Sequence, residues 1–204
     1  MAPEGGRSMD RELVERVRSG DEEAFGLIAD AAFDRCYAVA HRILGEAPAA
    51  QDATQQALLD IWRKLPDLRD PARFEAWCYR IVVHACYAEA RRTKRAIPGF
   101  LPEDHQASTT VDEFRAIVDR DEVERAFDRQ RVEHRAVLVL RYYLDLPLGE
   151  IAAILEVPTG TVKSRIHNGL RAMRAAIEAD ARTSARADAT KHAYTAHATT
   201  RWTP

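Results

Sequence analysis

Four basic residues without a single acidic neighbour lie in the short segment PTGTVKSRIHNGLRAMR, residues 158–174. They are Lys163, Arg165, Arg171 and Arg174. Lysine and arginine side chains pair with phosphate oxygens and with guanine edges, so this segment is suited to binding nucleic acid. The whole chain carries a formal net charge of -2 at pH 7, so the positive charge is local. A solvated helix face remains the alternative explanation.

Helical periodicity sorts this segment into two faces. The apolar face holds Val162, Ile166, Leu170, Met173 and Ile177. Polar side chains lie away from it, with Arg165 on the other flank: Lys163, Ser164, His167, Arg171 and Arg174. Upstream, LGEIAAIL predicts a short helix whose inward residues are Ile151, Ala152, Ile154 and Leu155, and EVP predicts a turn. Together these elements predict a helix-turn-helix, whose second helix enters the DNA major groove.

A second candidate site lies on the helix expected between Pro71 and a basic cluster, RRTKR. One face of that helix is predicted to be buried: Phe74, Trp77, Cys78, Ile81, Val82, Ala85 and Ala88. The opposite face carries Tyr79, Arg80, Val83, His84, Tyr87 and Arg91. Aromatic rings that alternate with arginines suit single-stranded nucleic acid, because rings stack on bases while guanidinium groups hold the backbone. Alternatively, each ring packs against a neighbouring helix.

A third candidate surface lies on the helix expected from about Ala50 to Leu65. Its predicted buried stripe is Ala57, Leu58, Ile61, Trp62 and Leu65. The far side shows Asp52, Gln56 and Arg63 with Leu59 among them. A single exposed leucine is common. Among carboxylate and amide groups, however, it can also mark a protein-docking surface.

Composition and charge set the fold class. The chain has 204 residues, of which 46% are hydrophobic and 30% charged, and glycine is sparse. Without alternating apolar runs, this composition predicts an all-α fold. We predict two small helical domains, residues 10–95 and 122–181, joined by a flexible acidic linker at 96–121. Residues 182–204 lack periodicity and are predicted to be a disordered tail.

Several function classes are disfavoured. The start of the chain has no apolar core of an export signal, and no run reaches the roughly 20 apolar residues of a membrane span. We therefore expect a cytoplasmic protein without membrane insertion. Cys36, Cys78 and Cys86 have no C-x-x-C spacing, so we expect no metal and no cofactor, although a zinc site with His41 or His84 is conceivable. No catalytic motif is present, so an enzyme is not expected.

A close resemblance to the region 4 helix-turn-helix of extracytoplasmic-function sigma factors is found in LGEIAAILEVPTGTVKSRIHNGLRAMR. In that family the motif IP.GTVKSRL is frequent at this position. The resemblance implies that this helix reads the duplex −35 element of promoters through Lys163, Ser164, Arg165, His167, Asn168, Arg171 and Arg174. Glu156 replaces a usual glycine of the turn, so a left-handed backbone there would be strained or avoided. Asn168 and Leu170 stand where many relatives carry arginine.

The N-terminal half is similar to region 2 of the same family. QDATQQALLDIWRKL resembles the helix that docks on the clamp helices of the largest polymerase subunit, which implies a polymerase-binding set of Asp52, Gln55, Gln56, Leu59 and Arg63. ARFEAWCYRIVVHACYAEARRTKR resembles the segment that opens and reads the −10 element, which implies roles for Trp77, Tyr79, Arg80, His84, Tyr87, Arg91 and Arg92. By the same analogy, the loop LPDLRDPAR would cradle a flipped-out base.

The resemblance implies a sigma factor that brings RNA polymerase core to promoter DNA and initiates transcription. Many relatives are held inactive by an anti-sigma factor, which makes such a factor a further candidate partner. The alternative is a stand-alone helix-turn-helix regulator whose N-terminal bundle senses a ligand or dimerises. That regulator would bind duplex operators without polymerase.

Overall fold

The computed structural model describes residues 11–96 and 120–199, with side chains described at 12–93 and 120–183. The N-terminal elements are α1 (Arg11–Arg18), α2 (Glu22–Leu44), α3 (Ala47–Lys64), the 3-10 turns η1 (Leu65–Asp67) and η2 (Pro71–Arg73), and α4 (Phe74–Ala96). The C-terminal elements are α5 (Arg120–Asp128), α6 (Val132–Leu138), the π-helical η3 (Val139–Tyr143), α7 (Leu148–Leu155) and α8 (Thr159–Thr199). The described ranges contain no strand, which confirms the all-α prediction. The predicted linker lies almost entirely outside them.

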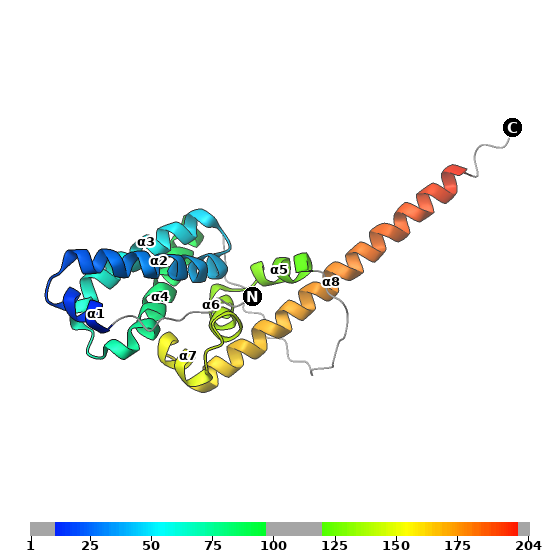
Figure 1. The fold of residues 1–204 in the computed structure, drawn as a ribbon. Helices are drawn as coiled ribbons and strands as arrows, with labels where there is room; N and C mark the ends of the chain where they lie inside the picture. Colours follow the sequence, from blue (N-terminus) through cyan, green and yellow to red (C-terminus); the bar gives the residue numbers. More distant parts are fainter. Residues whose placement is uncertain (1–10, 97–119, 200–204) are drawn as a thin grey trace.

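The N-terminal domain is a bundle in which α2, α3 and α4 pack on one another (Figure 1). Local signals set the helix ends: the Asp21 carboxylate accepts a hydrogen bond from the Ala24 amide at the start of α2, and Gly45 adopts a left-handed conformation at its end. One proline lies in the first turn of α3, and another lies in η1 directly after the end of α3, so prolines mark both ends of this helix. The interior of the bundle is apolar and includes Ile28, Ile43, Ile61 and Val82. Burial of each such side chain stabilises the fold by about 1.5–3 kcal/mol.

Most of the predicted buried face of α4 is buried, with two exceptions. Phe74, Cys78, Ile81, Val82 and Ala85 are buried, whereas Trp77 is half-buried and Ala88 is exposed. Val83, predicted on the opposite face, is also fully buried. The reason is tertiary: α6 and α7 of the C-terminal domain pack against the face of α4 that the sequence predicted to be open.

In the C-terminal domain, α8 packs along α5, α6 and α7. The sequence placed Leu170 on the packed face, but this side chain is 44% exposed. Gly169 takes its place: a Cβ atom there would lie 3.2 Å from Leu138 Cδ1 and 3.4 Å from His134 Cβ. A count of apolar side chains misses this arrangement, because the residue at the closest approach of α8 to α6 has no side chain.

We expect the substitution Gly169→Leu to lower the free energy of unfolding by about 1–3 kcal/mol, because the added side chain overpacks the contact with α6. Chemical denaturation monitored by circular dichroism measures this change. Gly160→Leu is the matched control on the same helix, since a Cβ atom there meets nothing within 4 Å. Equal stability of the two variants would show that α8 does not need the close approach.

α8 continues as a helix to Thr199, through most of the stretch from residue 182 that the sequence predicted to be a disordered tail. Alanine has the highest helix propensity, and this stretch contains neither glycine nor proline, which favours a helix. In Figure 1 this part of α8 projects away from the two domains. Within the described ranges, no helix combines the length and the hydrophobicity needed to cross a membrane.

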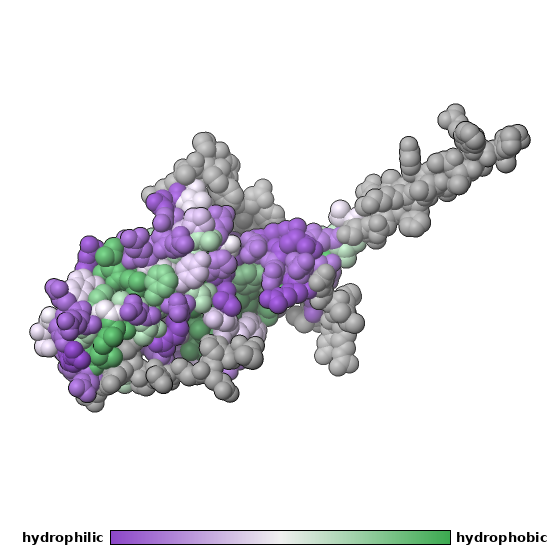
Figure 2. Space-filling view, turned by 45° about the horizontal axis from the view of Figure 1, so that its top comes forward, coloured by the Kyte–Doolittle hydropathy of each residue, from purple (hydrophilic) through white to green (hydrophobic). Residues whose placement is uncertain are grey.

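The two domains pack against each other along an interdomain seam, which we define as α2 and α4 on one side and α6, η3 and α7 on the other. The Arg42 guanidinium lies 3.7 Å from the centre of the Tyr143 ring, in a cation–π contact. Arg135 of α6 reaches Gly45 at the end of α2. Figure 2 shows one face of the molecule: hydrophobic and hydrophilic surfaces alternate over the N-terminal domain, whereas the region around α5 is strongly hydrophilic.

Candidate nucleic-acid interface

The predicted helix-turn-helix is formed by α7, a short turn and α8. Glu156 ends α7 in the left-handed conformation, with φ 55° and ψ 41°, so the backbone adopts the conformation that glycine would favour. The Glu156 and Val157 amides both donate to the Ala152 carbonyl, and the Pro158 carbonyl accepts from Val162 at the start of α8. The turn rests on a buried apolar set made of Ile151, Ile154, Leu155 and Val162.

The candidate DNA-reading residues of α8 divide by exposure. Lys163, Ser164, His167 and Asn168 are exposed, and Arg171 and Arg174 are half-buried beside them. Arg165 lies elsewhere on α8, close enough to Tyr87 of α4 and His134 of α6 for its charge to affect the pKa of both. Burial lowers the pKa of His134, and the nearby charges of Arg131 and Arg165 add to that effect. The first turns of α8 therefore present a polar, cationic face to solvent, as a major-groove helix requires.

A hollow of about 350 Å³ lies between the loop after α3, the start of α4 and α7. Small-molecule sites in proteins occupy roughly 300–1,000 Å³, so a nucleobase fits within it. Its lining includes Trp77 and three arginines, namely Arg69, Arg73 and Arg80. The sequence indicated only the loop as a whole. In the sequence, Arg69 and Arg73 stand on either side of Asp70 and Pro71. Asp70 caps η2 and fixes the loop, so this position is the signal that could have indicated both arginines as site residues.

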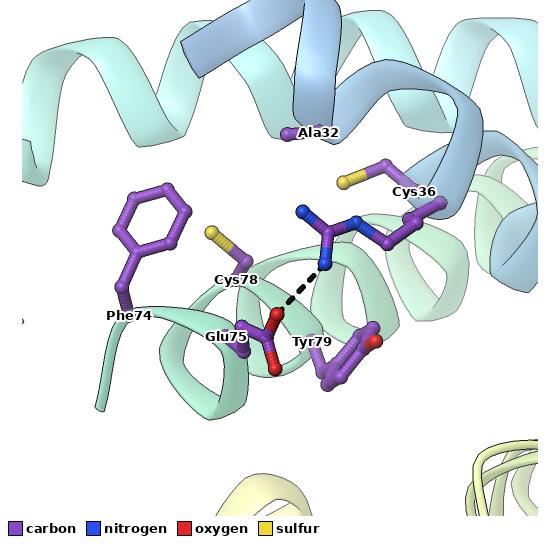
Figure 3. A pocket seen from close by; sticks show the side chains of 7 residues that line it. Ala32, Cys36, Phe74, Glu75, Cys78 and Tyr79 are labelled. Atoms are coloured by element: carbon purple, nitrogen blue, oxygen red, sulfur yellow. Dashed lines mark hydrogen bonds and ion pairs between the residues drawn. The ribbon is translucent and has the colours of Figure 1, made fainter. Parts of the chain in front are cut away.

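Tyr79 lies outside that hollow. It lines a small cavity between α2 and α4 together with Cys36, Phe74 and Cys78, and the cavity is bordered by an ion pair of 2.7 Å between Arg35 and Glu75 (Figure 3). Burial raises the pKa of Tyr79. In this arrangement its ring belongs to the packing of the N-terminal bundle, which was the alternative explanation for each single ring.

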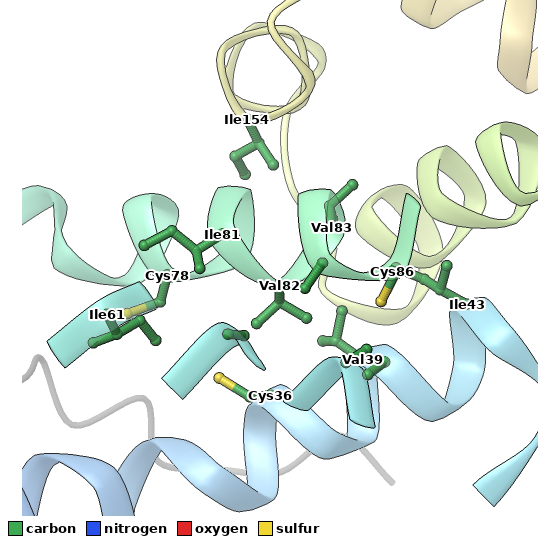
Figure 4. Packing of buried hydrophobic residues seen from close by; sticks show 14 of the residues in the cluster. Cys36, Val39, Ile43, Ile61, Cys78, Ile81, Val82, Val83, Cys86 and Ile154 are labelled. Carbon is green, nitrogen blue, oxygen red and sulfur yellow. The ribbon is translucent and has the colours of Figure 1, made fainter. Parts of the chain in front are cut away.

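Tyr87 lies in the interdomain seam. Burial raises its pKa to about 12, although the charge of Arg165 acts in the opposite direction. Its hydroxyl is buried without a hydrogen-bond partner, an arrangement that costs about 1–3 kcal/mol. Figure 4 shows Ile154 of α7 above α4, next to Ile81 and Val83. The C-terminal domain therefore covers part of the α4 face that the sequence indicated for single-strand binding.

The remaining strand-binding candidates have different partners. His84 and Arg91 are exposed. Arg92 donates to Asp52 of α3 over 2.6 Å and also to Glu89. The sequence indicated Arg92 for strand binding and Asp52 for polymerase binding, so this contact connects the two candidate surfaces. The structure thus brings Trp77, Arg80 and His84 along one side of α4, and leaves Tyr79 and Arg92 apart from them.

Four of the five polymerase-binding candidates line one groove between α3 and α4: Asp52, Gln55, Gln56 and Leu59. Leu59 is exposed there, as the sequence predicted. Gln56 donates to Asp60 over 3.2 Å, which orders the rim of the groove. Arg63 is exposed on α3 but does not line this groove. An exposed leucine within a polar groove is a suitable docking place for another protein.

The three cysteines are free and buried. Burial raises the pKa of Cys36 to about 11 and that of Cys86 to about 12, so both thiols are protonated at neutral pH. Their contacts are those of small apolar groups within helix interfaces. Among the described residues, no group of three or more His, Cys, Asp or Glu side chains is placed to hold a metal ion.

Two family descriptions match the chain in the order of its domains. "Sigma-70 region 2" matches residues 31–96, and "Sigma-70, region 4" matches residues 132–175. The ECF RNA polymerase sigma factor SigL of Mycobacterium tuberculosis is 32% identical over 167 residues, which are 78% of this chain and 94% of SigL. The chain is an extracytoplasmic-function sigma factor of the sigma-70 family.

A further relative agrees with this family membership, and two solved structures share the fold. The RNA polymerase sigma-H factor of Pseudomonas aeruginosa is 30% identical to this sigma factor, over 84% of this chain and 95% of the relative. The fold is similar to that of CnrH in its complex with the cytosolic domain of CnrY, with a TM-score of 0.57, 24% identity and coverage of 84% of this chain and 99% of CnrH. The sigma factor RpoE of Bartonella quintana, in complex with the anti-sigma factor NepR, also has a TM-score of 0.57, at 19% identity.

In this sigma factor, region 2 spans most of α2 together with α3 and α4, and region 4 spans α6 to the first half of α8. The groove beside Leu59 belongs to the N-terminal domain, the hollow lined by Trp77 lies between that domain and α7, and the cationic face of α8 belongs to region 4. The alternative of a stand-alone regulator is not favoured, because both regions are present in the order of the family.

Proposed function

We propose that this sigma factor selects promoters by dividing recognition between its two domains. The cationic face of α8 binds the −35 element as a duplex, and the hollow lined by Trp77 and Arg80 captures the unpaired −10 strand. The observation that carries this proposal is the pairing of two unlike sites in one chain: an exposed basic helix in a helix-turn-helix, and an indole among three arginines.

Strand capture supplies the energy for promoter opening. Stacking of an unpaired base on an aromatic ring contributes about 1–3 kcal/mol, and arginines around it hold the backbone. Binding of several unpaired nucleotides thereby offsets the cost of melting. In this proposal the sigma factor has no catalytic activity of its own, and polymerase core carries out the chemistry.

The groove beside Leu59 is proposed to dock on the clamp helices of the largest polymerase subunit. Asp52, Gln55 and Gln56 line the groove and supply polar contacts around the exposed leucine. Arg63 would add a contact outside the groove. Because its partners are polymerase and promoter DNA, we expect the protein to act in the cytoplasm. The sigma factor RpoE of Bartonella quintana, which is similar in fold, was solved with the anti-sigma factor NepR bound, so an anti-sigma factor is a further candidate partner here.

An electrophoretic shift assay with a promoter fragment tests this function. We expect the sigma factor to form a promoter-specific complex only with polymerase core, because its net charge of -2 gives the free protein no overall attraction for DNA. Core enzyme alone and a fragment with scrambled −35 and −10 elements are the controls. Tight, specific binding by the free protein would contradict the proposal and favour a stand-alone regulator.

A further inference from the structure

The turn of the helix-turn-helix contacts the strand-binding side of α4 directly. One carboxylate oxygen of Glu156 lies 3.1 Å from Nη1 of Arg80, and the other lies 3.7 Å from Nε2 of His84. Both partners are candidates for holding the −10 strand. The contact joins residues 76 positions apart in the chain, from the two separate domains.

Glu156 reaches this position at a cost to its backbone. Its φ of 55° lies in the left-handed region, which disfavours residues with a Cβ atom. A glycine would adopt the same turn without strain, but it would place no carboxylate at Arg80. The contact with Arg80 therefore depends on the Glu156 side chain, which a glycine at this turn would lack.

The surroundings of the contact are basic. The adjacent hollow is lined by Arg69 and Arg73 as well as Arg80. The carboxylate of Asp70, which also lines it, is already engaged with Arg73 at 3.4 Å. The Glu156 carboxylate accepts a hydrogen bond from Arg80 and lies close to His84, so it takes the position in which a strand phosphate would accept a charge-assisted hydrogen bond from Arg80.

We propose that Glu156 is a latch. Its carboxylate occupies the place beside Arg80 and His84 that a strand phosphate would take, which we call the phosphate seat, and it thereby holds region 4 over the strand-binding face of α4 in the free sigma factor. The inference rests on the proposed function, because the seat is meant for the −10 strand. A strand phosphate at Arg80 displaces the carboxylate, and the helix-turn-helix is then free to move to the −35 element.

The latch is suited to being opened. The side chains of Arg80, His84 and Glu156 are 40%, 50% and 54% exposed, and ion pairs at such exposure are weak. The Tyr87 hydroxyl, buried in the same seam without a hydrogen-bond partner, also regains a partner when the domains separate. The closed arrangement is therefore one that polymerase and DNA can overcome.

The substitution Glu156→Gln tests the latch, because it removes the charge and keeps the shape of the side chain. We expect the free variant to bind a fluorescently labelled, mixed-sequence single-stranded oligonucleotide roughly three- to tenfold more tightly than the wild type. We also expect a larger radius of gyration in small-angle X-ray scattering. Glu150→Gln, at an exposed glutamate of α7, is the control for the change in net charge and should match the wild type.

Unchanged affinity and unchanged scattering in Glu156→Gln would overturn the latch. Tighter binding without any change in scattering would overturn it as well, since Glu156 would then block the seat without holding the domains together. Transcription by wild-type protein with polymerase core separates this inference from the proposed function. If the wild type initiates at its promoter and Glu156→Gln behaves like the wild type throughout, only the latch fails; if the wild type does not initiate, the proposed function fails.

Discussion

Substitution of both Lys163 and Arg171 by alanine is expected to reduce promoter-directed transcription about 100-fold or more. Both side chains lie on the outer face of α8, in the turns that would enter the major groove. Each contact of a lysine or arginine with a base edge or a phosphate contributes about 1–3 kcal/mol, so two losses combine to a large effect. Run-off transcription with polymerase core and a duplex promoter measures it.

The salt dependence of promoter binding adds a second readout. Every phosphate contact that is lost should lower the slope of log K against log salt by about one. Arg182→Ala is the matched control, because Arg182 is exposed on the same helix but lies beyond the helix-turn-helix. A similar loss in Arg182→Ala would show that general positive charge, rather than the face near Lys163, attracts the promoter.

Trp77→Ala is expected to weaken binding of the −10 strand by roughly 5- to 150-fold, which corresponds to the stacking energy of one base. The indole lines the hollow beside Arg69, Arg73 and Arg80, and it packs on Phe74 with ring centres 6.0 Å apart. The measurement is the affinity of the assembled polymerase–sigma complex for a labelled single strand that carries the −10 element.

Trp62→Ala provides the control for loss of an indole from the same domain. Trp62 is 37% exposed on α3, where its ring meets Phe25 edge-on at 4.4 Å, and it lines no part of the hollow. We expect this variant to bind the strand as the wild type does. Duplex −35 binding serves as a further control in Trp77→Ala, and its loss would indicate a structural role for the indole instead of strand capture.

Helical periodicity predicted the helices and most of the core, because 3.6-residue spacing follows directly from the helix geometry. It could not predict which open face another domain would cover. Val83 and Tyr87 lie on the polar side of α4 by sequence, and both are covered because α6 and α7 pack there. Gly169 was missed for a related reason, since close helix packing is marked by the absence of a side chain.

The candidate sites were predicted as groups of residues, and their mutual contacts were not. The sequence indicated the loop before α4 but not that Arg69 and Arg73 would face Trp77. It assigned Arg92 to DNA and Asp52 to polymerase, whereas the structure pairs the two at 2.6 Å. It also indicated strain at Glu156 without its contact with Arg80, because contacts between distant segments depend on how the domains meet.

The most direct test of the account is start-site selection in vitro. Purified sigma factor and polymerase core are combined with a library of promoter fragments, and transcript 5′ ends are sequenced. We predict starts at a fixed distance from one pair of −35 and −10 elements, with loss of those starts in the Lys163 and Arg171 double variant and in Trp77→Ala. Transcripts whose 5′ ends are the same with and without the sigma factor would contradict the account.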